Sequence, residues 1–102
     1  MAQPDPQLYN TVAKSFFGRD ALGRHIYVFN DGPAWERRGL HYRVKAPGQP
    51  WSPPRLFFHA NTRNSYPTLL EESPHGYLCV WDSSTDPDQR RTAIRFGRLK
   101  LA

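Results

Sequence analysis

Hydrophobic and polar residues alternate along several short stretches of the chain. In RHIYVFND, Ile26, Val28 and Asn30 fall on one side of an extended backbone, while Tyr27 and Phe29 fall on the other. This two-residue period is typical of β-strands, and no stretch shows convincing helical periodicity. The prolines fall at strand starts and in loops, where no ladder hydrogen bond is lost. The pattern predicts an all-β chain with strands at residues 10–17, 25–30, 40–45, 55–59, 66–72, 77–82 and 92–101.

The chain contains two copies of one supersecondary unit. YVFND at residues 27–31 corresponds to CVWDS at 79–83, a shift of 52 (79 − 27), and GLHYRV at 39–44 corresponds to TAIRFG at 92–97, a shift of 53 (92 − 39). Repeats of about 40 to 50 residues with four strands each are typical of β-propeller blades. We therefore expect an N-terminal tail over residues 1–8, one blade over 9–60 and a second, incomplete blade over 61–102.

Two blades are too few for a closed ring, because propellers typically have about four to eight. The second unit also lacks a fourth predicted strand, and an open sheet edge invites pairing with another chain. We expect the chain to complete a propeller as a homo-oligomer, with a trimer favoured, or to be a fragment of a longer propeller. The alternative architecture is a small monomeric β-sandwich.

Composition narrows the possible partners only slightly. The net charge is +5, which permits binding to nucleic acid or anionic sugars, but the basic residues are spread out and form no long run. Cys79 is the one cysteine, so no intrachain disulfide can form. The first residues lack the pattern of a signal peptide, and no apolar stretch approaches the length of a membrane span. We expect a cytosolic chain, or a piece of a larger protein, without membrane contact.

The stretches HIYVFNDG, GQPWSPPRLFF, NSYPTLLEE and GYLCVWDSS resemble the sialidase-like β-propeller proteins, also known as BNR or Asp-box repeat proteins, near their C-terminal end. The Asp-box of that family, Ser-x-Asp-x-Gly-x-Thr-Trp, would correspond to residues 44–51. Gly48 and Trp51 keep the spacing, but Val44, Ala46 and Pro50 replace the Ser, Asp and Thr. The resemblance therefore implies a turn and a packing tryptophan at this place, without the side-chain hydrogen bonds of the motif.

The resemblance also implies a nucleophilic tyrosine, and NSYPTL makes Tyr66 the one candidate. A tyrosine nucleophile needs a neighbouring carboxylate to take its proton, because its ordinary pKa is about 10. The family supplies that glutamate, and most of its carboxylate-binding arginines, from blades that this chain does not contain. Arg38, Arg63 or Arg95 could contribute to such a clamp, although none of them matches a family position.

Further candidates for ligand binding lie in the predicted loops. The arginine pairs occupy equivalent loops of the two units, and Trp35 lies in the long GPAWERRG loop. With Arg63, the candidate ligand-binding residues are Trp35, Arg37, Arg38, Arg63, Arg90 and Arg91. The four histidines show no metal-ligand spacing and DSSTDPD matches no calcium loop, so we expect neither a metal nor a cofactor.

The function that these features favour is a non-catalytic propeller module, an oligomeric scaffold that could bind carbohydrate through its many aromatic side chains. One alternative is the C-terminal fragment of a sialidase-type glycoside hydrolase. The other, a basic nucleic-acid-binding β domain, rests only on the charge and the aromatic content.

Overall fold

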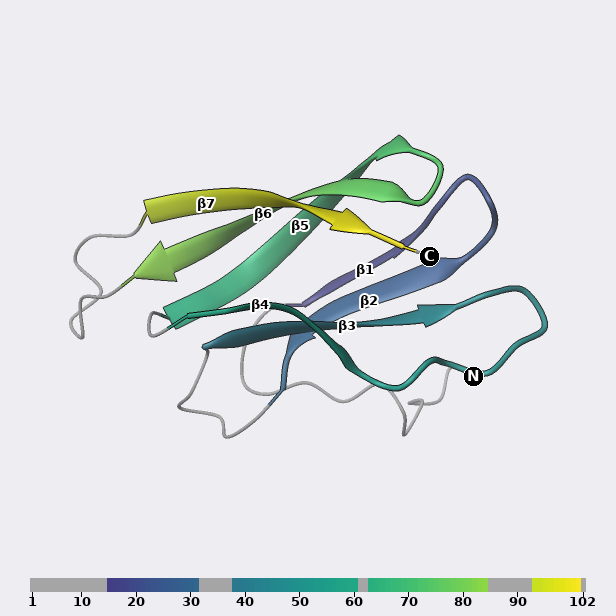
Figure 1. Ribbon diagram of the computed structural model, residues 1–102, viewed down its shortest axis with the longest axis horizontal. Helices are drawn as coiled ribbons and strands as arrows, with labels where there is room; N and C mark the ends of the chain where they lie inside the picture. The colour runs from purple at the N-terminus through teal and green to yellow at the C-terminus, as the bar shows by residue number, and fades with distance from the viewer. Residues whose placement is uncertain (1–14, 32–37, 61–62, 85–92, 102) are drawn as a thin grey trace, which may run out of the picture.

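The computed structural model describes residues 15–31, 38–60, 63–84 and 93–101, and these form strands and turns without a helix (Figure 1). The prediction of an all-β chain is therefore confirmed. The strands, in chain order, are β1 (Phe16–Arg19), β2 (His25–Asn30), β3 (Gly39–Lys45), β4 (Arg55–His59), β5 (Arg63–Ser73), β6 (Gly76–Ser84) and β7 (Ala93–Lys100).

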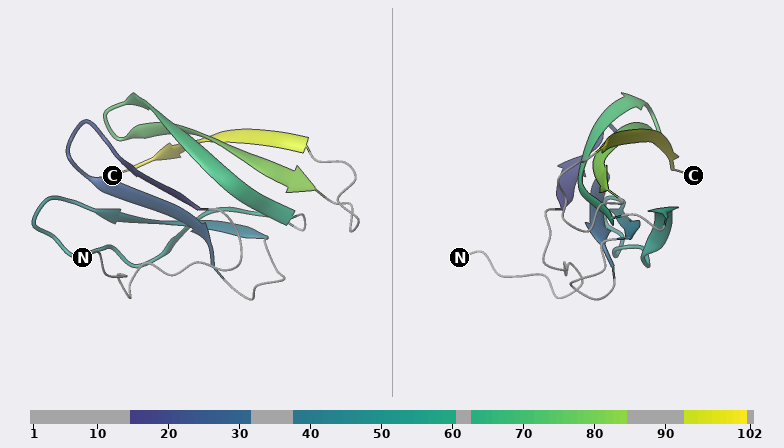
Figure 2. Two further views of the ribbon diagram at one scale, coloured as in Figure 1. Left: turned by 180° about the vertical axis from the view of Figure 1, so that it is seen from behind. Right: turned by 90° about the vertical axis from the view of Figure 1, so that its left-hand side faces the viewer.

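The strands form two antiparallel sheets. β1 to β4 form sheet A and β5 to β7 form sheet B, and within each sheet every strand pairs with the next one along the chain. The two sheets stack face to face (Figures 1 and 2). Sheet B approaches sheet A most closely through β5, which contacts β1, β2 and β3. That these sheets are propeller blades, divided between residues 60 and 61, stays a prediction.

The hydrophobic core lies between the two sheets and follows from the alternation in the sequence. On β6, Tyr77, Cys79 and Trp81 are buried against sheet A, whereas Leu78 and Val80 point to the other face and are half-buried. Burial raises the pKa of the Cys79 thiol to about 12, which agrees with its predicted role as a small buried hydrophobe. The core consists of Ile26, Val28, Leu40, Leu69, Tyr77, Cys79, Trp81, Leu99 and Leu101.

The strand boundaries agree closely with those predicted. β2 and β4 have the predicted bounds, and β3 begins one residue earlier. β5 begins at Arg63, three residues before the predicted start, and continues through a register shift between Ser65 and Thr68. The first strand continues to Arg19, beyond its predicted end, and its predicted start lies outside the described residues. The predicted turn at Gly48 is present, and its φ of +73° is a conformation that glycine adopts without steric cost.

Two buried asparagines connect the sheets where β2 ends and β5 begins. Both Asn30 and Asn64 are fully buried. The Asn30 side-chain amide donates hydrogen bonds to the backbone oxygens of Gly39, at 3.0 Å, and of Asn64, at 2.8 Å. The Asn64 amide in turn donates to the backbone oxygen of Arg38 at 2.8 Å. Each of the two asparagines therefore donates a hydrogen bond from its side-chain amide to a backbone oxygen of the other unit.

The oxygen of the Asn64 side chain holds two groups of β6. It accepts hydrogen bonds from the indole nitrogen of Trp81 and from the hydroxyl of Ser83, both at 3.1 Å. Trp81 is 3% exposed, so its indole N–H could not bond to bulk water if the Asn64 oxygen were removed. Buried donors of this kind cost about 1–3 kcal/mol each when they lose their acceptor.

Replacement of Asn64 by alanine is expected to lower the free energy of unfolding by roughly 3 kcal/mol, because it removes the acceptor of two buried donors. Urea denaturation measures the change. Gln49→Ala is the matched control, since it removes an amide from an exposed turn and should change stability by less than about 0.5 kcal/mol. Equal stability of the two variants would contradict a role for Asn64 in joining the sheets.

Candidate functional site

Three residues singled out in the sequence lie at one end of the molecule, where β3 and β5 begin. The backbone oxygen of Arg38 accepts the hydrogen bond from Asn64, and Arg63 and Tyr66 flank Asn64 on β5. Arg38 is exposed and Arg63 is partly exposed. The remaining candidates, Trp35, Arg37, Arg90 and Arg91, lie outside the described residues. Binding roles for all six ligand candidates stay predictions.

Tyr66 lies inside β5, at the register shift, rather than at the start of a strand. Its φ of +57° is unusual for a residue with a side chain, and the residue is 43% exposed. The register places Asp82 opposite Ser65, so a carboxylate stands on the adjoining strand. Glu71 is five residues further along β5, about 16 Å away at roughly 3.3 Å per residue. The strand geometry therefore brings Asp82, and not Glu71, into the neighbourhood of Tyr66.

The two adjacent glutamates of β5 bond to different neighbours, as expected for residues on opposite faces of a strand. Both carboxylate oxygens of Glu71 accept a hydrogen bond from the backbone N–H of Ala21 at 3.1 Å. Glu72 forms an exposed ion pair with Arg98, with 3.1 Å between Nε and Oε1. That the two glutamates cannot act as a glycosidase carboxylate pair stays a prediction.

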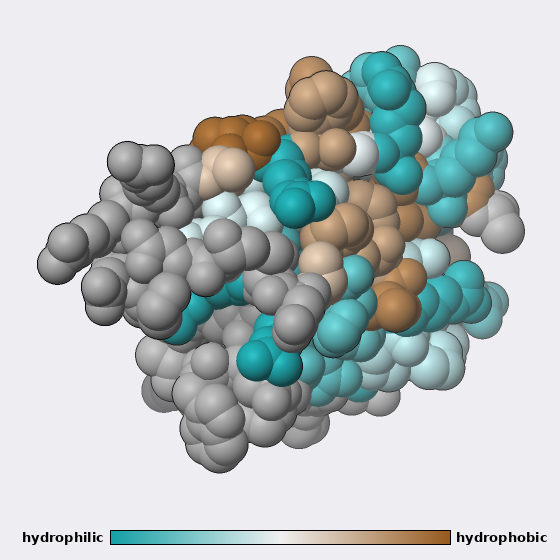
Figure 3. Space-filling model, turned by 60° about the vertical axis from the view of Figure 1, so that its left-hand side comes forward, coloured by the Kyte–Doolittle hydropathy of each residue, from teal (hydrophilic) through white to brown (hydrophobic). Residues whose placement is uncertain are grey.

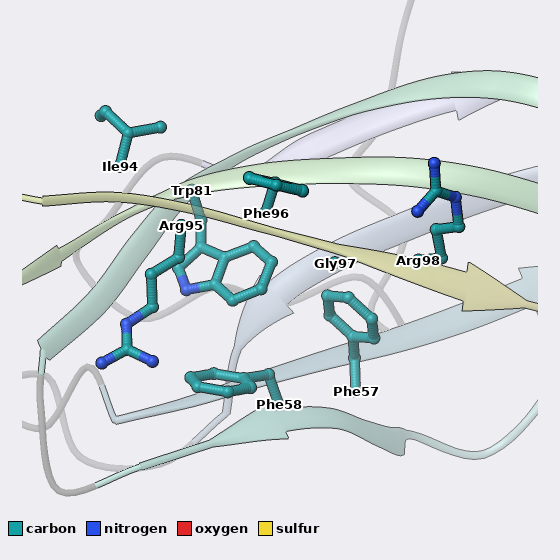
Figure 4. A pocket seen from close by; sticks show the side chains of 8 residues that line it. All are labelled: Phe57, Phe58, Trp81, Ile94, Arg95, Phe96, Gly97 and Arg98. Atoms are coloured by element: carbon teal, nitrogen blue, oxygen red, sulfur yellow. The ribbon is translucent and has the colours of Figure 1, made fainter.

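An open pocket of about 500 Å³ lies between β4 and β7, where the sheets diverge (Figures 3 and 4). The half-buried rings of Phe57 and Phe58 form its β4 side, and the Trp81 ring contacts both of them. The ring centroid of Trp81 is 5.5 Å from that of Phe57, edge to face, and 5.0 Å from that of Phe58. Figure 3 shows hydrophobic side chains reaching the surface in this view, with hydrophilic ones beside them. The pocket is lined by Phe57, Phe58, Trp81, Ile94, Arg95, Phe96, Gly97 and Arg98.

A glycine of β7 makes room for the indole ring. A Cβ atom on Gly97 would lie 3.4 Å from Cη2 of Trp81 and 3.8 Å from Cζ of Phe57, so a larger side chain here would enter the aromatic cluster. Trp81 is held from its other side by the hydrogen bond to Asn64. The hydrogen bond to Asn64 therefore orients the indole, and the far edge of the ring lies next to Gly97.

The two arginines of the pocket differ in their surroundings. Arg98 is already paired with Glu72. The guanidinium of Arg95 lies over the ring of Phe58, 5.6 Å from its centroid, and no carboxylate of the described residues pairs with it. Figure 4 shows Arg95 pointing from β7 toward Phe58, while Ile94 and Phe96 point to the opposite side of the strand. Arg95 is thus an exposed cation held at the edge of an aromatic surface.

The sequence indicated only part of this pocket. The sequence predicts Arg95 as one of three arginines that could form a carboxylate clamp, and it predicts Phe57 and Phe58 only as strand residues. The signal that could have found them is the adjacent pair of phenylalanines on a strand at the edge of a sheet. Because neighbouring residues of a strand face opposite sides, two adjacent large apolar residues place an apolar side chain on each face of the strand. Such a pair indicates that both faces are in contact with other groups.

A second polar cluster lies at the opposite end of the molecule, around the β1–β2 turn. The buried carboxylate of Asp20 pairs with Nε of Arg24 at 2.7 Å and accepts hydrogen bonds from the backbone N–H groups of Leu22 and Arg24. Arg24 also lies 3.0 Å from Nδ1 of His75. These contacts fasten the turn of sheet A to the β5–β6 turn of sheet B, and we assign the cluster a structural role.

No group of three or more histidine, cysteine, aspartate or glutamate side chains that could hold a metal ion occurs within the described ranges. The same residues contain no helix long and apolar enough to cross a membrane. Comparison of the chain with protein-family models, curated proteins and solved structures gives no match. The resemblance to sialidase-like propellers accordingly stays a prediction.

The Asp20 carboxylate makes the stability of the fold depend on pH in acid. Burial alone would raise the pKa of Asp20, but the hydrogen bonds from Arg24, with a contribution from Tyr77, lower it below its ordinary value of 3.8. A depressed folded-state pKa stabilises the fold above the unfolded value, and this stabilisation is lost as the pH falls through the folded-state pKa. We expect wild-type stability to fall steeply below about pH 4.

Asp20→Asn is expected to be less stable than the wild type at pH 7, by roughly 3 kcal/mol, because it leaves the largely buried guanidinium of Arg24, whose side chain is 11% exposed, without its counter-charge. Its stability should also change less between pH 5 and pH 2. Urea denaturation at a series of pH values measures both effects. Parallel pH profiles of wild type and variant would show that another carboxylate governs the acid response.

Proposed function

We propose that the chain is a non-catalytic carbohydrate-binding module, and that the pocket between β4 and β7 takes an acidic sugar residue. The observation that carries the proposal is the placement of Arg95, which has no carboxylate partner among the described residues, beside the half-buried rings of Phe57 and Phe58. Pockets of about 300–1,000 Å³ with apolar walls and a few polar groups are typical small-ligand sites. The volume of about 500 Å³ falls inside that range.

A sugar ring with an acidic substituent matches both parts of the pocket. The aliphatic face of the ring would lie on Phe57, while the carboxylate or sulfate would bind the guanidinium of Arg95. Arginine suits this role because its planar fork binds such groups through two hydrogen bonds. The fixed indole of Trp81 supports the aromatic wall from below, so little ordering of the site would accompany binding.

The charge distribution favours a sugar over a nucleic-acid strand. Proteins that hold single strands combine aromatic side chains with a basic groove that follows several phosphates. Of the two arginines that line this pocket, Arg98 is paired with Glu72, which leaves Arg95 as the cation available to a ligand. One available guanidinium suits one acidic group better than a phosphate backbone.

Titration calorimetry with a heparin-derived oligosaccharide, and with a neutral oligosaccharide of the same length, tests the proposal. We expect preference for the acidic sugar, and Arg95→Gln should weaken its binding about tenfold or more, because a hydrogen bond to a charged group contributes about 1.5–3 kcal/mol. Arg19→Gln is the matched control, since it removes an equally exposed positive charge from β1, away from the pocket.

The outcomes separate the possible explanations. Equal weakening by Arg95→Gln and Arg19→Gln would mean that the net charge of +5, rather than the pocket, attracts the sugar. Tighter, steeply salt-dependent binding of random single-stranded RNA would favour the nucleic-acid alternative. Absence of binding to any acidic glycan on an array would overturn the proposal.

The enzymatic alternative has one observation in its favour, the placement of Asp82 on the strand beside Tyr66. The pocket proposed for the sugar does not include Tyr66, and we therefore expect no hydrolysis of a fluorogenic sialoside even at high protein concentration. Turnover that disappears in Tyr66→Phe would contradict the non-catalytic assignment. Turnover unaffected by that change would point to a contaminating enzyme.

A further inference from the structure

A second pocket, hereafter the arginine pocket, lies between Leu101, after β7, and the loop that joins β3 to β4. Its volume is about 350 Å³, and it shares no lining residue with the pocket proposed for the sugar. Two arginines, Arg24 and Arg55, line it, and no acidic side chain is among the described residues that do so. The lining is therefore suited to an anion.

The guanidinium of Arg24 is held by both sheets but is not fully bonded. Its Nε donates to Asp20 at 2.7 Å, and its Nη1 lies 3.0 Å from Nδ1 of His75. Its third nitrogen, Nη2, is buried and has no hydrogen-bond partner among the described residues. A buried donor without an acceptor is unfavourable. Because Arg24 lines the arginine pocket, an anion there would lie beside this guanidinium and could supply the missing acceptor.

Arg55 brings a second positive charge to the arginine pocket. It pairs across the strands with Tyr42, whose side chain packs against the core, so both residues are on the face of sheet A that points toward sheet B. Arg55 is exposed, and no carboxylate of the described residues pairs with it. Its guanidinium is thus available to a ligand.

The carboxylates at this end of the molecule are already bonded to other groups. Asp20 accepts hydrogen bonds from Arg24 and from the backbone of the β1–β2 turn. Glu71 accepts from the backbone N–H of Ala21, and Glu72 pairs with Arg98. The acidic side chains described at this end therefore leave the positive charge of Arg55 uncompensated.

Hydrogen bonds hold the loop that forms one wall of the arginine pocket. The backbone N–H of Ser52 donates to the oxygen of Val44 at 2.8 Å, and the backbone N–H of Val44 donates to the Ser52 hydroxyl at 2.9 Å. The backbone N–H of Gln49 donates to the oxygen of Ala46 at 3.0 Å. The loop has this shape without a ligand, so little ordering would accompany binding.

We propose that the arginine pocket binds a small organic carboxylate. The carboxylate would be bound by Arg55 and lie beside Arg24, because guanidinium groups match the two oxygens of a carboxylate. Val44 and Leu101 would contact the hydrocarbon body of the ligand. Such apolar lining suits a hydrocarbon better than the additional charged oxygen of a phosphate. This site is separate from the proposed sugar site and does not depend on it.

Titration of the ¹⁵N-labelled protein with hexanoate, and with hexanamide as a neutral molecule of similar shape, tests the proposal by NMR. We expect hexanoate to shift the amide signals of Ala46, Gln49 and Leu101, and to bind at least about tenfold more tightly than hexanamide. Arg55→Gln should weaken hexanoate binding about tenfold or more. Lys100→Gln is the matched control, because it removes an exposed positive charge next to Leu101 on the opposite face of β7, and should change the affinity less than about twofold.

A second variant tests the position of the ligand without changing the charge. Ala46→Leu would fill part of the arginine pocket and keep both arginines, and it should weaken hexanoate binding about tenfold or more. Undiminished binding by this variant would place the carboxylate elsewhere and overturn the proposal. Melting temperatures confirm that each variant is folded.

The other outcomes are equally decisive. The proposal is overturned if hexanoate shifts none of these signals, or if it binds no more tightly than hexanamide. Equal weakening by Arg55→Gln and Lys100→Gln would mean that general positive charge attracts the anion. Tighter binding of inorganic phosphate at the same signals would overturn the assignment of a carboxylate. Binding of the heparin-derived oligosaccharide by Arg55→Gln should be unchanged, since Arg55 does not line the sugar pocket, so the two proposals can fail separately.

Discussion

The side chain of Asn64 is the contact on which the arrangement of the two sheets depends. Its amide bonds the backbone before β3, and its oxygen holds the indole of Trp81, while Asn30 reaches its backbone from the other sheet. Hydrophobic burial brings two sheets together but does not fix their relative position. Directional hydrogen bonds in a dry interior fix the relative position of the sheets, because a shift of either sheet would leave buried polar groups without partners.

This contact at one end, and the contacts of Arg24 with His75 and of Ala21 with Glu71 at the other, connect the two sheets. The opposite edges, β4 and β7, have no comparable polar connection within the described ranges. The sheets consequently diverge there, and the aromatic rings of Phe57 and Phe58 are only half-buried. The pocket is thus a consequence of where the polar contacts lie, and Trp81 belongs both to the core and to the wall of the pocket.

The strand pattern was predictable because alternation is a local property of the sequence. GYLCVW alternates half-buried and buried residues as a period of two requires, whereas every residue of HIYVFN after His25 is buried, and the structure has strands at both. The register shift in β5 was not predictable, since Tyr66 occupies a positive φ that nothing in NSYPTL specifies. The asparagine network was missed for a related reason. Asn30 and Asn64 are 34 residues apart, and their pairing depends on how the sheets stack.

The repeat also bears on the two outer faces of the stacked sheets. In a stack of repeated units, each unit covers one face of its neighbour, so two terminal faces remain. The terminal face of sheet A buries Tyr27 and Phe29 but exposes Phe17 and Leu56 at its edges. The terminal face of sheet B exposes Leu70, Ile94 and Phe96. A stack with both terminal faces open can close into a ring of copies.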